Sequence, residues 1–253
     1  MSAQPMPAAG GAPTDGVPRI GALGRMIGVL FNPRETYSDI ARNPSWIVPV
    51  VVIVVISLAF GWVMNQRIDW GDYIRHQAEK SPRFAQLPEE QKQRALEPQI
   101  KYSPHFVYAF CVLGPLLTPV IVGAVYLLAF NMAGAGAKFK QALAVVAHAQ
   151  STTLISGPLG ILTMWLRSYG DVTPENMLAS NVGAFLGSDS PQWMRSLGGS
   201  LDIFSIWFLA LIALGFAATN PKKISTGKAI GIVVGIWLVV VMAKVGWAAA
   251  FGS

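Results

Sequence analysis

The sequence predicts an all-α integral membrane protein with five transmembrane helices, preceded by an amphipathic helix that lies at the membrane interface. Of its 253 residues, 53% are hydrophobic and only 13% are charged, whereas soluble domains carry about 25% charged residues. Apolar runs long enough to cross a bilayer recur along the chain. Because a soluble core could not bury this much apolar surface, the sequence excludes a soluble globular protein.

The charge balance indicates which partners the protein can bind, and the cysteine count limits disulfides and metal sites. The formal net charge is +6, which in a membrane protein favours contact of Lys and Arg with anionic lipid headgroups. No pattern of interleaved aromatic and basic residues points to nucleic acid. The single cysteine, Cys111, excludes an intrachain disulfide and a cysteine-based metal cluster within one chain.

The chain before the first apolar run divides into two parts. Residues 1–22 are rich in Pro, Gly and Ala and predict a disordered tail. Residues 23–45 predict an interfacial helical segment, because apolar residues at helical spacing flank Arg25 and Asn32-Pro33 is typical of a helix start. The alternative for this segment is a helical lead-in that does not contact lipid.

Residues 46–253 form the predicted membrane domain. The first span carries no charge for 19 residues, close to the roughly 20 that a helical crossing needs, and Trp46 and Trp62 bracket it as an aromatic belt would. A long polar loop over 65–104 follows, with a short helix predicted up to about Leu96. The five predicted spans are 46–64, 105–132, 141–166, 201–219 and 228–251.

Two basic turns between the later spans predict the orientation. The Gly/Ala stretch 133–137 holds a helix poorly, and the ammonium groups of Lys138 and Lys140 after it do not sit in hydrocarbon. The second turn contains Lys222 and Lys223. Short loops rich in Lys and Arg stay cytoplasmic, so the N-terminus is predicted inside and the C-terminus outside. The seven basic residues of the long loop oppose this orientation by count, although six acids offset them.

Two residue patterns predict how the spans pack. Helix breaks are predicted at the prolines inside spans, Pro115, Pro119 and Pro158. The strongest helix-packing signal is a row of glycines at every fourth position, Gly227, Gly231 and Gly235.

A candidate intramembrane polar site consists of His148, Gln150 and Asn131. Ionisable residues within spans are often functional, which suggests a substrate-binding or proton-linked role for His148. The alternative is a neutral histidine that is hydrogen-bonded between helices. No acidic residue lies deep in a span to form a proton relay with it.

A candidate ion pair joins the last two spans. Asp202 and Lys244 are equally far along the chain from the turn at Lys223, so at about 1.5 Å per residue they reach a similar height. The alternative is that each side chain extends to the headgroups independently.

Enzyme and cofactor motifs are missing from the sequence. It contains no HExxH, no GxSxG and no pair of carboxylates within a span, and its Gly-Ala-Gly stretch lacks the strand–turn–helix context of a nucleotide fingerprint. The sequence therefore predicts no catalytic residues, no metal and no cofactor.

Three stretches resemble a known family. FNPRETYSDIARNPSW before the first span, GAGAKFKQALAVVAHA at the turn into the third span, and ISTGKA entering the last span are similar to the bacterial branch of the Yip (Ypt-interacting protein) domain family. The resemblance covers Leu23 to the C-terminus and implies a multi-spanning helical protein without known catalysis. Eukaryotic members are linked to Rab GTPases and vesicle traffic, a role that does not carry over to a bacterium without that machinery.

These features favour a non-enzymatic membrane protein that binds partner proteins or lipids, the lipids being anionic, and that organises the membrane. A homo-oligomer and a bacterial plasma (inner) membrane location fit the same prediction. The alternative is a small-solute transporter or channel that uses broken helices around His148. A wide polar cavity at His148 would favour transport, and a dry, filled bundle would favour the organising role. A membrane enzyme ranks third.

Overall fold

The computed structural model describes residues 20–175, 177–187 and 190–251. The predicted tail, residues 1–22, falls almost wholly outside the described part. The fold class is confirmed, because the chain consists of helices and connecting turns, and no β-strand occurs among the described residues.

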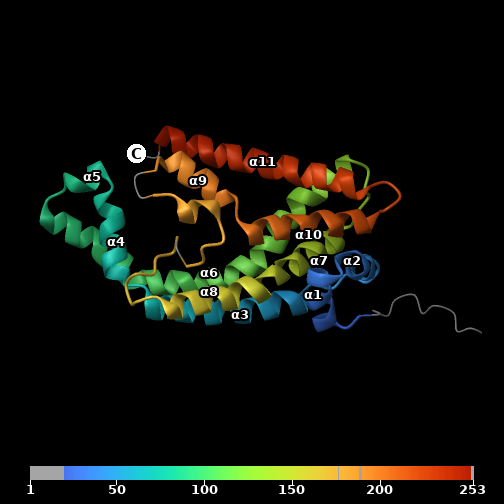
Figure 1. The fold of residues 1–253 in the computed structure, drawn as a ribbon, viewed down its shortest axis with the longest axis horizontal. Coiled ribbons are helices and arrows are strands. Elements are labelled where there is room, and N and C mark those ends of the chain that lie inside the picture. The colour runs from blue at the N-terminus through green and yellow to red at the C-terminus, as the bar shows by residue number, and fades with distance from the viewer. Residues whose placement is uncertain (1–19, 176, 188–189, 252–253) are drawn as a thin grey trace, which may run out of the picture.

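Helices follow one another along the whole described chain (Figure 1). Their bounds are α1 Ala22–Phe31, α2 Pro33–Arg42, α3 Ile47–Arg67, α4 Trp70–Glu79, α5 Pro82–Ala85, α6 Glu89–Met132, α7 Phe139–Ala149, η1 Gln150–Thr152, α8 Thr153–Leu166, η2 Val182–Phe185, α9 Gln192–Ser200, α10 Ile203–Thr219 and α11 Thr226–Phe251. Each predicted span coincides with a helical segment.

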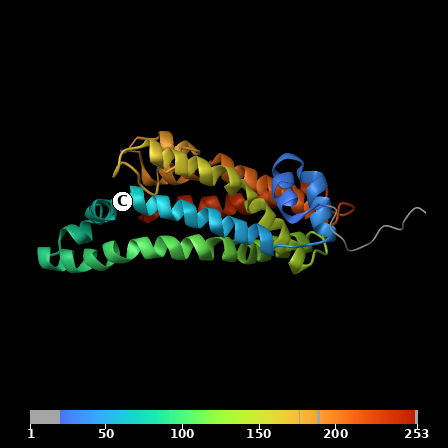
Figure 2. The ribbon, with the colours of Figure 1, turned by 90° about the horizontal axis from the view of Figure 1, so that it is seen from below.

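The long helices form an elongated bundle with two distinct ends (Figures 1 and 2). At one end lie α1 and α2, together with the turn between α6 and α7 and the turn between α10 and α11; we call this the α1–α2 end. At the other, the α4–α5 end, lie α4, α5 and the last turns of α11. Both basic turns are therefore on the same end as the N-terminal helices, because an even number of long helical segments precedes each of them (Figure 1).

Helices α3, α6 and α11 are long and apolar enough to cross a membrane. Helix α10 is also apolar but shorter, with 17 residues. The third predicted span is a helical segment of three parts, α7, η1 and α8. Whether all five segments cross the bilayer stays a prediction, and the length and apolarity of three of them support membrane integration.

Helix α6 differs from the prediction because it is one continuous helix of 44 residues. The sequence predicts a short loop helix that ends near Leu96 and a separate span from His105. The structure joins them, with Pro98 and Pro104 inside the helix. The helix also continues through Pro115 and Pro119, so these prolines are not breaks.

The third segment is interrupted at a different place from the predicted one. Helix α8 continues through Pro158, and the change of helix geometry lies earlier, at the 3₁₀ turn η1. Short 3₁₀ stretches inside a longer helix often mark a functional or strained point. The turn η1 contains Gln150, Ser151 and Thr152, whose side chains are considered below.

The core of the bundle lies towards the α1–α2 end, where α2, α6, α7, α10 and α11 meet. Its centre is aromatic: the rings of Phe130 on α6 and Phe216 on α10 are stacked with centroids 4.5 Å apart, and Tyr126 packs beside both. Parallel stacked rings of this kind add about 0.5–1.5 kcal/mol beyond the area they bury. The N-terminal helices are thus built onto a rigid platform.

Candidate functional site

All the buried polar and charged side chains found in the described chain belong to α1, α2, the end of α7 and η1. They are Arg25, Thr36, Asp39, His148, Gln150, Ser151 and Thr152. Helix α1 packs against both α7 and η1, so we call this set the buried polar junction. Burial of a polar group costs free energy unless the group is hydrogen-bonded or paired, and the partners of Arg25 and Asp39 explain how the N-terminal helices are held.

The buried polar junction is built around an ion pair between α1 and α2. Nη2 of Arg25 lies 2.8 Å and Nε 3.0 Å from Oδ2 of Asp39, and the two side chains are only 1% and 3% exposed. The guanidinium also donates to the carbonyl oxygen of Asn43 at 2.9 Å and to Oγ of Ser45 at 3.0 Å. Two neighbouring N–H groups of the planar arginine fork thus donate to one oxygen of the carboxylate. The ion pair fixes the angle between α1, α2 and the entry to α3.

Helix α2 is fastened to α7 by two further bonds. The hydroxyl of Tyr37, fully buried, donates to the carbonyl oxygen of Val145 at 3.4 Å. Burial raises the pKa of Tyr37 above its usual value, so the phenol stays protonated as a donor. At the other end, Nε2 of Gln141 donates to the carbonyl oxygen of Ala41 at 2.9 Å, which satisfies a free carbonyl at the C-terminus of α2.

The face of α1 that points away from the bundle is apolar and exposed. Leu23, Ile27 and Phe31 follow each other at every fourth position and are 62%, 57% and 76% exposed. Residues four apart share one helical face, so this row is a continuous exposed apolar strip, which we call the α1 apolar row. Met26 and Val29 point inward and are buried. The predicted interfacial segment is therefore two helices, one face of which packs on the bundle.

His148 lies inside the buried polar junction with no solvent-exposed surface. Its Nδ1 is 2.8 Å from the carbonyl oxygen of Ala144 on the same helix, and its Nε2 has no hydrogen-bond partner among the described residues. It lies close enough to Arg25 for an electrostatic interaction. A side chain this closely packed does not line a water-filled path.

Gln150 satisfies a carbonyl that a proline leaves without a donor. In an α-helix the amide of residue 119 would donate to the carbonyl of residue 115, but Pro119 has no N–H. Nε2 of Gln150 donates to the Pro115 carbonyl oxygen at 3.3 Å instead. Neighbouring helices commonly supply such replacement donors in membrane proteins, which explains why α6 continues through this proline.

We expect Gln150→Leu to lower the free energy of unfolding by about 1–3 kcal/mol, the cost of a buried unsatisfied carbonyl. Pro119→Ala restores the helical donor, so the cost of Gln150→Leu should be smaller in the Pro119→Ala background. The parent protein, the two single variants and the double variant are unfolded in denaturing detergent and followed by tryptophan fluorescence. The four unfolding free energies give the cost of Gln150→Leu in each background. Equal costs in the two backgrounds would show that the Gln150–Pro115 bond does not stabilise α6.

Asn131, the third member of the predicted polar site, lies elsewhere. Its side chain brackets the turn after α6: Oδ1 accepts from the amide of Ala137 at 2.8 Å, and Nδ2 donates to the carbonyl of the same residue at 3.1 Å. The turn includes Gly134 and Gly136 with φ of 89° and 64°, conformations that favour glycine. The structure thus brings His148 and Gln150 together and assigns Asn131 to the turn.

Asp202 and Lys244 have other partners than each other. Asp202 caps α10, because its Oδ2 accepts from the amide of Ser205 at 2.7 Å, and its Oδ1 accepts from the hydroxyl of Ser180. Nζ of Lys244 is 3.4 Å from Oγ of Ser200. Within the described residues no ion pair joins Asp202 to Lys244. A carboxylate at a helix N-terminus is stabilised by the free amides there. This explains why Asp202 bonds to the start of α10 rather than to Lys244.

The predicted glycine row on α11 contacts nothing in the chain. At Gly227, Gly231 and Gly235 an added Cβ would meet no atom within 4 Å, and all three residues are exposed. The close helix contacts occur at other glycines. A Cβ on Gly61 would lie 2.6 Å from Sγ of Cys111, and one on Gly160 would lie 2.6 Å from Cε2 of Phe60. Residue spacing reveals a small-residue face but not the direction in which it points.

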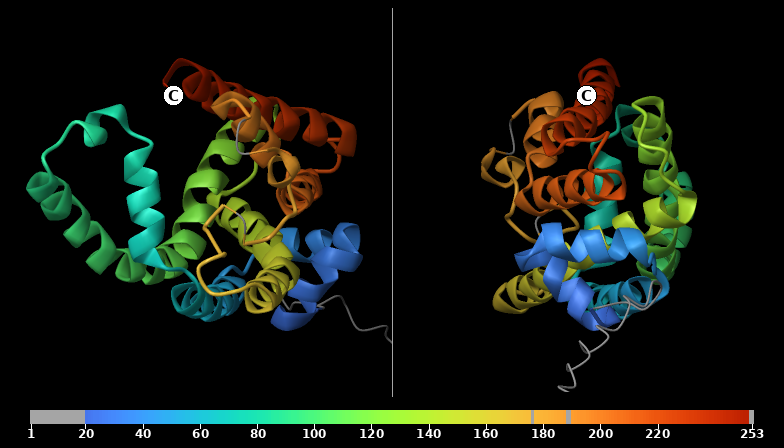
Figure 3. Two further views of the ribbon diagram at one scale, coloured as in Figure 1. Left: turned by 60° about the vertical axis from the view of Figure 1, so that its left-hand side comes forward. Right: turned by 90° about the vertical axis from the view of Figure 1, so that its right-hand side faces the viewer.

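The α1–α2 end gathers exposed basic side chains from three segments that are distant in sequence. We call them the basic collar: Arg34, Arg42, Lys138, Lys140, Lys222, Lys223 and Lys228. Two hydrogen bonds join the turns that carry them, from Nδ2 of Asn220 to the Ala135 carbonyl at 2.8 Å and from Nζ of Lys228 to the Ala133 carbonyl at 2.7 Å. The right-hand view in Figure 3 looks onto this end, with α1 and α2 in front.

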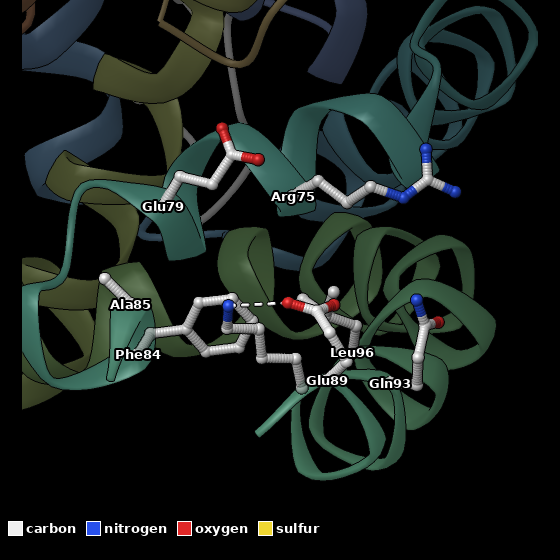
Figure 4. A pocket seen from close by; sticks show the side chains of 8 residues that line it. Arg75, Glu79, Phe84, Ala85, Glu89, Gln93 and Leu96 are labelled. Atoms are coloured by element: carbon white, nitrogen blue, oxygen red, sulfur yellow. Dashed lines mark hydrogen bonds and ion pairs between the residues drawn. The ribbon is translucent and has the colours of Figure 1, made fainter. Parts of the chain in front are cut away.

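A small cavity at the α4–α5 end has charges of both signs, unlike the basic collar. It has a volume of about 260 Å³ and lies between α4, α5 and the start of α6 (Figure 4). Charges of both signs line it, including Arg75, Glu79 and the Glu89–Lys92 pair at 2.8 Å, marked by the dashed line. In the described chain no group of three or more potential metal ligands occurs. Mixed exposed charges of this kind are usually solvated surface.

Sequence reasoning missed the Arg25–Asp39 pair. The available signal was an arginine among apolar residues of one amphipathic helix and an aspartate beside Ile40 on the next. Spacing along the chain does not show that two charges 14 residues apart meet, because the contact depends on how α1 folds back on α2.

Comparison with known proteins adds one finding. The chain matches the family described as the Yip1 domain over residues 27–248, a range that begins within α1 and ends within α11. No curated protein and no solved structure matches it.

Proposed function

The chain belongs to the Yip1 domain family of membrane proteins, and from this premise we propose that it is a non-enzymatic organiser of the bilayer. It binds anionic lipid headgroups or partner proteins at its α1–α2 end. We place this end in the cytoplasm of a bacterium, at the plasma membrane, with five crossings and the C-terminus outside. The basic turns support this orientation, since short Lys- and Arg-rich loops stay cytoplasmic.

The observation that carries the proposal is that the α1 apolar row and the basic collar lie at the same end of the bundle (Figures 1 and 3). An apolar helix face with basic residues around it binds the interface of an anionic membrane. Each Lys or Arg near an anionic surface contributes about 1 kcal/mol. The buried polar junction holds α1 on the bundle, so the apolar row does not reorient independently of the spans.

We expect neutralisation of the collar to reduce binding of anionic lipid. The test variant combines Lys138→Gln, Lys140→Gln, Lys222→Gln and Lys223→Gln in the full-length protein. Extraction from phosphatidylglycerol–phosphatidylethanolamine vesicles and native mass spectrometry then measure the phosphatidylglycerol that each protein retains. At about 1 kcal/mol per residue, the loss of four charges should reduce retention about tenfold or more.

A matched control removes four exposed basic side chains from the α4–α5 end: Arg75, Lys80, Arg94 and Lys101, each changed to Gln. This variant has the same net charge as the test variant and should retain phosphatidylglycerol like the parent protein. Equal losses in both variants, or no loss in either, would contradict a binding site at the α1–α2 end.

The burial of His148 gives the transporter alternative no support. Transport through broken helices needs polar groups that face a water-filled cavity at mid-membrane depth. The interruption at η1 instead packs against α1, α3 and α10, and the His148 side chain has no exposed surface.

A further inference from the structure

A second cavity lies in the half of the bundle nearer the α4–α5 end, with a volume of about 560 Å³. Helix α3 packs against both α6 and α8, and Figure 2 shows it between them. The cavity lies where these three helices meet the segment after α8. Its volume falls in the range of about 300–1,000 Å³ that is typical of small-molecule sites.

The walls of this cavity are mainly apolar, with polar side chains at its two ends. Phe60 on α3 and Phe110 on α6 supply apolar surface, and Ser57 and Ser156 supply hydroxyls at the inner end. Phe110 is 71% exposed, so the cavity is open to the side at α6. In a membrane this opening faces lipid, and a molecule from the bilayer can enter without crossing water.

The depth of the cavity corresponds to one leaflet. Ser57, at its inner end, is ten residues before Arg67, a distance of about 15 Å along a helix, which is half of a hydrocarbon core of roughly 30 Å. Arg67 marks the interface: its Nε donates to the Met164 carbonyl at 3.1 Å, and its guanidinium lies 5.2 Å from the ring centroid of Trp165. Arginine and tryptophan together are typical of headgroup depth.

One acidic side chain lies at the outer end of the cavity. Glu175 is the only charged residue among the described residues that line it. Its Oε1 accepts hydrogen bonds from the hydroxyl of Tyr73 at 2.8 Å and from Nε2 of Gln77 at 3.2 Å. These bonds from α4 hold the carboxylate in place. Burial and the bond to Glu175 raise the pKa of Tyr73 to about 12, so the phenol remains a donor at neutral pH.

We propose that this cavity binds one aminophospholipid from the leaflet at the α4–α5 end. The primary ammonium of the headgroup pairs with Glu175, and an acyl chain lies along Phe60 and Phe110 towards Ser57. A carboxylate at headgroup depth, above a mainly apolar cavity one leaflet deep, complements an amphiphile of this length whose headgroup ends in a primary ammonium. The site goes beyond the proposed function, because it lies at the opposite end of the bundle and recognises the ammonium group of a headgroup rather than its anionic groups.

The test uses the full-length protein in vesicles that contain a photoactivatable phosphatidylethanolamine with a diazirine at the end of one acyl chain. We expect cross-links in 107–111 of α6 and 153–157 of α8. Unlabelled phosphatidylethanolamine should compete with the probe more effectively than phosphatidylcholine or phosphatidylglycerol with the same chains. Equal competition by all three lipids would overturn the proposal, because it would show that no headgroup is selected.

Two variants separate the headgroup from the chain. Glu175→Gln should reduce cross-linking about two- to fivefold, the range for loss of one exposed ion pair. Ser156→Phe fills the inner cavity and should abolish cross-linking at both segments. The control Val239→Phe adds a similar ring on α11 at a position that is 71% exposed and should change nothing.

Thermal unfolding of each variant, followed by tryptophan fluorescence, shows whether it is folded. Glu175→Gln changes one exposed residue, so it keeps the proposal testable even if Ser156→Phe unfolds the protein. Unchanged cross-linking in Glu175→Gln would overturn the proposal. So would unchanged cross-linking in a folded Ser156→Phe protein.

Discussion

Asp39→Ala should lower the free energy of unfolding by about 3–5 kcal/mol, because it leaves the guanidinium of Arg25 buried without its counter-ion. Arg25 is 1% exposed and cannot reach water unless α1 separates from the bundle. We therefore expect two effects together, a lower unfolding midpoint in denaturing detergent and faster cleavage by trypsin at Arg34 and Arg42. The second effect reports the release of the N-terminal helices.

A paired variant separates the charge from the packing. Replacement of a buried ion pair by apolar residues of similar volume is often neutral or stabilising, so Arg25→Met combined with Asp39→Leu should recover most of the stability lost in Asp39→Ala. Glu35→Ala is the control, because Glu35 is an exposed acid on the same helix. A midpoint of Asp39→Ala equal to that of Glu35→Ala would show that the ion pair does not hold the junction.

Gly215→Val should be strongly damaging to the core. A Cβ at Gly215 would overlap Cγ1 of Val145 and would lie 3.0 Å from Cε1 of Tyr37. Both neighbours are fully buried and have no free space to move into. Overpacking of this kind costs about 1–3 kcal/mol for small additions and more when backbone must shift. The expected result is a loss of folded protein on size-exclusion chromatography in mild detergent, together with a lower thermal midpoint.

Gly231→Val provides the matched control on α11, where an added Cβ would meet no atom within 4 Å. This variant should fold like the parent protein. If Gly231→Val were as damaging as Gly215→Val, the glycine row of α11 would be packed in the native membrane, and the assignment of helix contacts to other glycines would be contradicted.

The long polar connection over 65–104 and the prolines of α6 show where sequence reasoning is limited. A predicted loop over 65–104 contains α4, α5 and the first turns of α6, because amphipathic stretches of ten residues or fewer give a weak periodic signal. The prolines Pro115 and Pro119 inside the second predicted span predicted breaks in its helix, which continues through both. The donor that replaces the missing amide of Pro119 comes from Gln150, which is more than 30 residues away and cannot be identified from local sequence.

What the sequence determined by itself is the class of the protein and the approximate course of its apolar helices. Long uncharged runs must be buried in lipid or protein whatever their neighbours are, so their physical consequence is local. The tertiary structure alone decided which face of each helix points inward. It placed Gly215 rather than Gly231 at a close helix contact. It also paired Arg25 with Asp39 and made Asp202 the N-cap of α10. These outcomes depend on contacts between distant segments, and a residue's own neighbours in sequence do not determine them.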